Sequence, residues 1–248
     1  MVLRIFLHSV RLVFGQLGAA LRISAVLYII GMAIGAIGLY YQYQAFASEG
    51  SQAGAWQFFV AALISVVPYL WIAVAWHRFV LLDEAPRAIV PTPPGDRIWS
   101  YFGRAIQMGL LIIVFAIGCG LLLTVAMVAS NGSPVLALPI MFVFVAVGVL
   151  ITYRLAPMFP GAAIGQSVGV GEAWKVTSGA SGTFFILAIL SAIGSFLLDL
   201  PGELLARLPG SPFTVLTWVA VSSWVNLMVG VSILTTIYGV YLEKRSIS

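Results

Sequence analysis

The chain has 248 residues, of which 61% are hydrophobic and only 8% are charged. A soluble domain carries about 25% charged residues, so this composition excludes a water-soluble globular protein and predicts a membrane protein. The net charge of +4 does not predict nucleic-acid binding, because the basic residues lie beside apolar segments. The single cysteine, Cys119, excludes an intramolecular disulfide, and no Cys/His cluster or cofactor motif occurs in the sequence.

Residues 1–20 form the first predicted element, an amphipathic helix. Apolar residues recur there at three- and four-residue spacing, with Arg4, His8 and Arg11 on the other side. We expect this helix to lie in the membrane interface. The alternative is that it packs on the bundle as an ordinary helix.

Six apolar segments are predicted to cross the membrane, whose hydrocarbon core of about 30 Å takes roughly 20 helical residues. They pair into three hairpins, each returning to a basic end. Pro68 lies inside the second segment and predicts a kink. The predicted fold class is therefore all-α, a polytopic membrane protein with amphipathic cytoplasmic surface helices and one membrane domain over residues 1–248. The six spans are approximately residues 23–41, 56–80, 105–129, 135–153, 184–198 and 213–241.

The connecting segments are more polar than the spans. Residues 82–96 contain four prolines and cannot form a regular helix. Residues 97–107 are predicted to be a short amphipathic piece, and residues 171–177 a short surface helix. Residues 199–212 are predicted to be a loop with one amphipathic turn. The three hairpin units share this layout, which predicts parallel repeats, although any six-span protein with short outer loops would look similar.

The basic residues are strongly biased toward one side of this layout. Arg207 is the only one of the 12 lysines and arginines on the other side. Because short cytoplasmic loops are enriched in Lys and Arg, the basic side is predicted to be cytoplasmic, with both termini on it. The basic side carries Arg4, Arg11, Arg22, Arg78, Arg87, Arg97, Arg104, Arg154, Lys175, Lys244 and Arg245.

Two segments carry a resemblance to a known family. Residues 9–30 read as a surface helix that runs through Arg22 into the first span. Residues 153–177 place an arginine at a span end, then a stretch of small residues and prolines, then EAWKVTSG at residues 172–179. Together they resemble the bacterial six-span proteins grouped with the membrane domain of glycerophosphoryl diester phosphodiesterases. The resemblance implies a bacterial inner-membrane protein. In those phosphodiesterases catalysis resides in a separate soluble barrel, so the resemblance carries no enzymatic activity over to this chain.

Five residues are candidates for contact with lipid headgroups or a partner protein. His77 and Arg78 end the second span and Arg154 ends the fourth, where the alternative is a snorkelling positive-inside anchor. Lys175 could grip a lipid phosphate while Trp174 lies at the headgroup level. The alternative for this pair is a helix start followed by interfacial anchors.

Small and polar residues inside the spans predict helix packing. Gly31 and Gly35 form a Gly-x-x-x-Gly pair that permits close backbone approach, within the chain or between chains. Ser222 and Asn226, with Ser223, make the one concentrated intramembrane polar patch of the sequence. We expect this patch to join helices by hydrogen bonds rather than to bind a substrate.

No charged residue lies near the middle of any predicted span, which argues against a proton-coupled transporter. The sequence therefore predicts a non-catalytic accessory, assembly or scaffolding subunit of a membrane complex. The alternative is a permease or lipid-handling protein with a cavity between hairpins. An enzyme acting at the headgroup level is the least favoured hypothesis. The expected partners are membrane lipids, anionic ones preferred, and other membrane-protein subunits or a second copy of the chain.

Overall fold

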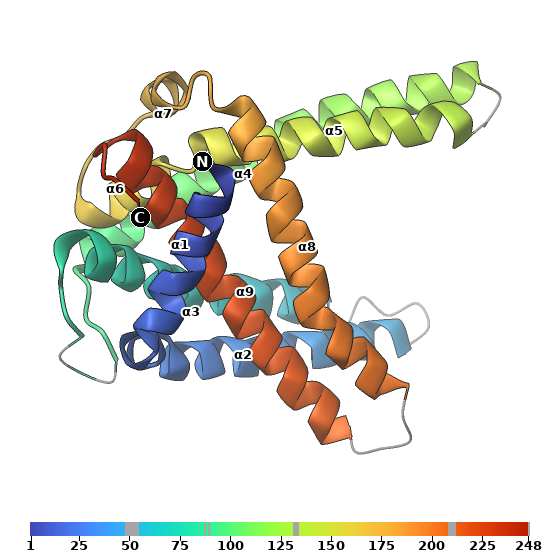
Figure 1. Cartoon of the computed structure of the whole chain (residues 1–248). Helices are drawn as coiled ribbons and strands as arrows, with labels where there is room; N and C mark the ends of the chain where they lie inside the picture. Colours follow the sequence, from blue (N-terminus) through green and yellow to red (C-terminus); the bar gives the residue numbers. More distant parts are fainter. Residues whose placement is uncertain (48–54, 87, 89, 131–133, 208–211, 248) are drawn as a thin grey trace.

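The computed structural model describes residues 1–47, 55–86, 88, 90–130, 134–207 and 212–247, and the ordered elements within these ranges are all helices (Figure 1). Arg87, which the charge bias includes, lies outside the described residues. The helices are α1 (Val2–Gly15), α2 (Leu17–Ala47), α3 (Ala55–Leu82), α4 (Gly95–Ala129), α5 (Pro134–Leu155), α6 (Met158–Ile164), α7 (Val170–Val176), α8 (Ser181–Ala206) and α9 (Pro212–Tyr241).

Six of these helices are long and apolar enough to cross a membrane, so the chain is an all-α polytopic membrane protein, as the sequence predicts. Helices α2–α3, α4–α5 and α8–α9 pair as three hairpins. The short helices α1, α6 and α7 and both chain termini gather at one end of the molecule (Figure 1). The hairpins diverge from that end, and the α4–α5 hairpin projects farthest from the rest of the molecule.

The described helices extend beyond the predicted spans, and α4 and α8 take in segments that were predicted to be separate. Helix α4 begins at Gly95, so the amphipathic piece predicted at residues 97–107 is continuous with the span. Helix α8 runs through Pro201 to Ala206, which corrects the loop predicted from residue 199.

Helix α9 contacts α8 beside Pro201. Because proline has no N–H, the carbonyl four residues earlier, that of Leu197, loses its helical donor, and the indole of Trp218 donates to the next carbonyl, that of Leu198, at 2.9 Å. Gly202 allows this approach, since a Cβ there would lie 3.0 Å from the Trp218 ring.

Helix α1 packs on the bundle along one face. Ile5, Ser9 and Val13 are fully buried against neighbouring helices, chiefly α9 and α8. Leu3 and Phe14, on another face, remain exposed. The helix thus packs as a member of the bundle and also keeps an uncovered apolar strip.

The main core lies where α1, α2, α3 and α9 meet, and two tryptophans cross it. The indole of Trp76 on α3 donates to Ser232 of α9 at 2.8 Å. The indole of Trp224 on α9 donates to Ser24 of α2 at 2.7 Å. Each bond satisfies a buried N–H while the large ring fills the core, which suits Trp to the crossing point of helices.

Helices α2 and α3 pack closely at two glycines. A Cβ at Gly31 would lie 2.9 Å from the Tyr69 ring, and one at Gly38 would lie 3.2 Å from Ala61. Gly35 has no such neighbour within 4 Å. Of the predicted pair, Gly31 therefore lies at a contact within the chain and Gly35 does not. Seven residues span nearly two turns of 3.6 residues, which keeps Gly31 and Gly38 on the side facing α3.

We predict that Gly31→Ala destabilises the protein, because the added methyl collides with the Tyr69 ring. Overpacking of this kind costs about 1–3 kcal/mol. Thermal unfolding in detergent should show a lower midpoint for this variant. Gly35→Ala is the matched control, since its methyl enters open space, and an equal loss in both variants would contradict the packing described above.

Candidate functional site

His77 is an interior residue. Its side chain has 0% exposure. Its Nδ1 lies 2.8 Å from the Thr235 hydroxyl on α9, and its Nε2 lies 3.3 Å from the Tyr101 hydroxyl on α4. His77 therefore joins three helices, and the headgroup or partner contact expected for it is corrected, because its ring is not accessible.

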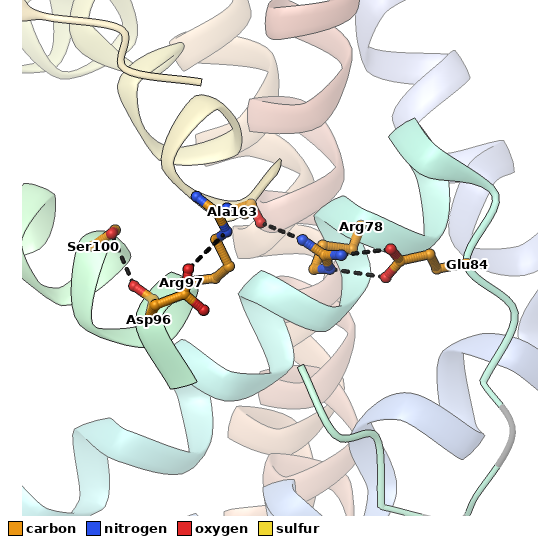
Figure 2. Close-up of polar contacts among 6 residues, drawn as sticks. All are labelled: Arg78, Glu84, Asp96, Arg97, Ser100 and Ala163. Carbon is orange, nitrogen blue, oxygen red and sulfur yellow. Dashed lines mark hydrogen bonds and ion pairs between the residues drawn. The ribbon is translucent and has the colours of Figure 1, made fainter. Parts of the chain in front are cut away.

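Arg78 is committed to contacts within the chain, as Figure 2 shows. Its Nε donates to Glu84 at 2.8 Å, and its Nη1 donates to the carbonyl of Ala163 near the end of α6 at 3.1 Å. Only 13% of its side chain is exposed. Arg78 thus ties α3 to the connector that follows it and to α6.

Arg97 lies near Arg78 and packs on the same end of α6. It pairs with Asp96 at 3.2 Å (Figure 2). Its guanidinium lies against Gly165, whose φ of +90° strongly favours glycine. A Cβ at Gly165 would lie 2.5 Å from the Arg97 guanidinium. Arg78 and Arg97 therefore both serve the local fold.

The structure brings Arg154 and Trp174 together and places Lys175 beside them. The guanidinium carbon of Arg154 lies 3.8 Å from the centroid of the Trp174 ring. Its Nη2 donates to the Trp174 carbonyl at 2.6 Å, and its Nε lies 3.5 Å from the Thr177 hydroxyl. Trp174 and Lys175 are exposed and Arg154 is half-buried. These three residues, called here the Arg154 cluster, form a cationic surface at the junction of α5 and α7.

The Arg154 cluster keeps its positive charge. Among the described residues, the ion pairs are Arg78–Glu84, Arg97–Asp96 and Arg245–Glu243, and none involves Arg154 or Lys175. Glu172, in the first turn of α7, is the acidic residue nearest to them along that helix. Two cations and one carboxylate leave an excess of positive charge.

Another titratable side chain near the short helices is His8 on α1. Burial, and second the charge of Arg11, lower the pKa of His8 below its ordinary value of 6.5. His8 is therefore neutral near pH 7, and the positive charge of this end of the molecule comes from arginine and lysine.

A groove of about 800 Å³ lies between the α4–α5 and α8–α9 hairpins. This inter-hairpin groove has no charged residue in its lining, and Tyr153, on its wall, donates to Ser191 of α8 at 3.3 Å. Other lining residues include Ile112, Phe115, Cys119, Gly120 and Leu123 of α4, Met141, Phe144, Gly148 and Thr152 of α5, Ala188 of α8, and Gly230, Ile233 and Leu234 of α9.

The groove and the Arg154 cluster lie on different faces of α5, because at about 100° per residue Arg154 is opposite Val145 and Thr152. The last lining residues on this helix are Thr152 and Tyr153, directly before Arg154. From Met141 to Thr152 the lining covers about 17 Å at a rise of 1.5 Å per residue. One leaflet of a hydrocarbon core about 30 Å thick is about 15 Å deep. The groove is thus as long as one leaflet is deep.

In the predicted polar patch on α9, Asn226 bonds to another helix and Ser222 bonds within its own helix. Asn226 accepts a hydrogen bond from Ser195 of α8 at 2.9 Å and so joins two helices. Ser222 is buried, but its hydroxyl donates to the Val219 carbonyl of its own helix at 3.3 Å. The expectation of a bond between helices is therefore met by Asn226 and not by Ser222.

A more extensive set of polar contacts lies farther along α9. Ser232, Thr235 and Thr236, called here the α9 hydroxyl stripe, are buried and contact Trp76, His77 and Ser9 respectively. Sequence reasoning missed the stripe as a unit. Its signal was the spacing of three and four residues, which places the three hydroxyls on one side of a helix.

No family model, curated protein or solved structure matches this chain. Within the described residues, no group of three or more His, Cys, Asp or Glu side chains is placed to hold a metal ion. The fold defines the class, a polytopic membrane protein with six described helices long and apolar enough to span a membrane.

We predict that Thr235→Val lowers stability, because it leaves Nδ1 of the buried His77 without its hydroxyl partner. An unsatisfied buried polar group costs about 1–3 kcal/mol. Thermal unfolding in detergent measures the loss. Thr217→Val is the control on the same helix, since Thr217 is exposed and donates to the Phe213 carbonyl of its own helix. Similar midpoints for the two variants would refute the role given to Thr235.

Proposed function

We propose that this chain is a non-catalytic lipid-handling membrane protein that binds phospholipid in the inter-hairpin groove. The groove carries the proposal, because it is apolar and its volume of about 800 Å³ lies within the range of about 300–1,000 Å³ typical of ligand sites. Its walls come from two separate hairpins, so a bound chain contacts α4, α5, α8 and α9 together.

The physical basis of binding is packing rather than exclusion from water. Lipid tails are as apolar as leucine, so a groove in the membrane gains little from hydrophobicity alone. A fitted acyl chain gains many small dispersion contacts, which are collectively large. The glycines of the lining, Gly120 and Gly230, leave room because no atom lies within 4 Å of a Cβ built at either position.

The buried histidine supports a role without catalysis. A histidine activates a hydroxyl by accepting its proton, but the Thr235 hydroxyl donates to the Val231 carbonyl at 2.9 Å and so accepts from Nδ1 of His77. The exposed fractions of His77 and Thr235 are 0% and 1%, so a substrate also has no access to them. We therefore assign this pair to helix packing.

A second candidate function is an accessory, assembly or scaffolding subunit of a membrane complex. The exposure of α4 favours it, because none of the most apolar stretch of this described helix is buried. Another subunit or a second copy of the chain could cover that face. The resemblance to the membrane domain of glycerophosphoryl diester phosphodiesterases is compatible with either function.

We infer that the protein resides in the bacterial inner membrane with both termini in the cytoplasm. The gathering of α1, α6, α7 and the termini at one end supports this orientation, together with the concentration of Lys and Arg in segments next to that end. The bacterial origin rests on the family resemblance alone.

We predict that Gly120→Leu reduces the phospholipid that co-purifies with the protein, because the new side chain enters the groove. Gly118→Leu is the matched control, since Gly118 is on the same helix, has the same open surroundings and does not line the groove. Lipid extraction and mass spectrometry measure the lipid retained per protein in mild detergent. The proposal fails if the two variants retain as much lipid as the wild type.

The same preparations distinguish the accessory function. A lipid-handling protein should remain a single chain with bound lipid in native mass spectrometry. A stoichiometric partner or second copy that occupies the groove, with no lipid bound there, would favour the subunit role and contradict lipid binding.

We predict opposite accessibility for two exposed positions, Ser246 near the C-terminus and Glu203 near the far end of α8. In a Cys119→Ala background, a membrane-impermeant maleimide applied to spheroplasts should label Glu203→Cys and leave Ser246→Cys unlabelled. Inverted membrane vesicles should give the reverse pattern. Labelling of both positions from one side would overturn the orientation.

A further inference from the structure

We propose that α1 docks the protein on anionic phospholipids of the leaflet next to the chain termini, with an apolar strip among the acyl chains and two arginines at the phosphates. The strip, called here the α1 strip, consists of Leu3, Leu7, Val10 and Phe14, and the arginines are Arg4 and Arg11. Helix α1 does not line the inter-hairpin groove, so this surface is a second lipid contact that the proposed function does not use.

The inner face of α1 is fixed to the bundle. Ile5, Ser9 and Val13 each have 0% exposure, and the Ser9 hydroxyl lies 2.9 Å from the Thr236 hydroxyl of α9. At about 100° per residue these three buried side chains share one side of the helix. A helix held on one side by α8 and α9 keeps its opposite side turned toward the surroundings of the molecule.

The α1 strip lies on that opposite side. Its four side chains fall within about 60° of one another around the helix axis, and their centre is about 130° from the centre of the buried face. Leu3, Leu7 and Phe14 are 57%, 40% and 49% exposed. From Leu3 to Phe14 the strip runs about 17 Å at a rise of 1.5 Å per residue. A continuous apolar face of this kind inserts at the boundary between headgroups and acyl chains.

The length and direction of α1 suit a helix that lies along the membrane surface. Its 14 residues extend about 21 Å, which is too short to cross a hydrocarbon core of about 30 Å. Helix α1 also runs across the direction of the α2–α3 hairpin, whose two helices are long enough to span the membrane (Figure 1).

Arg4 and Arg11 indicate the charge of the partner. Both are exposed, and both lie about 80° around the axis from the centre of the strip. Helix α1 contains no acidic residue, and none of the ion pairs among the described residues involves either arginine. Two cations beside an apolar strip complement phosphates above acyl chains. A second copy of the chain would bring the same cations, with no carboxylate on its α1 to meet them.

The test uses the whole protein in a Cys119→Ala background, with a bimane fluorophore on Phe14→Cys, in vesicles of phosphatidylcholine and phosphatidylglycerol. A spin-labelled lipid quenches the fluorophore only when it lies beside it. Spin-labelled forms of both lipids should quench, phosphatidylglycerol more strongly. Arg11→Gln should lower the relative affinity for phosphatidylglycerol roughly fivefold, as expected for loss of one basic residue at a membrane surface. Arg207→Gln, an exposed arginine at the far end of α8, is the control and should change nothing.

Each part of the proposal has an outcome that overturns it. Absence of quenching by both lipids, at Phe14→Cys and at the second strip position Leu7→Cys, places the strip outside lipid. Equal quenching by the two lipids at low salt overturns the anionic partner. Salt at 1 M, where the Debye length is about 3 Å, should remove the preference and leave quenching by phosphatidylcholine intact.

The groove variant separates this inference from the proposed function. Quenching at Phe14→Cys should persist in Gly120→Leu, because the groove and α1 do not share lining residues. Loss of quenching in Gly120→Leu would show that the labelled lipid occupies the groove and would overturn the site on α1. Conversely, quenching at α1 with equal lipid retention in Gly120→Leu and Gly118→Leu supports α1 and contradicts only the groove.

Discussion

Hydrogen bonds from the α9 hydroxyl stripe hold the centre of this bundle together. Among lipid tails, apolar side chains gain little by leaving one apolar environment for another, so helices associate through close packing and buried polar contacts. Ser232, Thr235 and Thr236 reach Trp76 and His77 on α3 and Ser9 on α1. The positions of α1, α3 and α9 thus depend on serine and threonine side chains that barely change the mean hydropathy of a span.

The need for close packing or polar contacts between helices in lipid also explains why the α4–α5 hairpin diverges from the other helices. Its contacts with the rest of the bundle lie near the end that carries the short helices, where Tyr101 meets His77 and Tyr153 meets Ser191. Farther along α4 the side chains are apolar and exposed. Without polar partners or close glycine contacts to α8 and α9, the hairpin separates from them, and the inter-hairpin groove is the space that results.

Much of the architecture can be derived from the sequence, because apolar length and the distribution of arginine reflect the bilayer directly. The six helices and their pairing are of this kind. Contacts between segments far apart in the chain cannot be derived in this way. Nothing near His77 in the chain indicates Thr235 or Tyr101, so its burial could not be anticipated from its neighbours. The continuation of α8 past residue 199 was likewise missed, because the indole of Trp218 that contacts the helix there belongs to another helix.

The α9 hydroxyl stripe also bears on how the protein is made. Ser9 precedes Thr236 by 227 residues, and His77 precedes Thr235 by 158. During translation the earlier helices therefore enter the bilayer long before their polar partners leave the ribosome. Contacts so remote in the chain form slowly. Trp76 and His77 need temporary partners, such as water or lipid carbonyls, until α9 inserts and completes the bundle, whereas the Ser9 hydroxyl has one in the Ile5 carbonyl of its own helix.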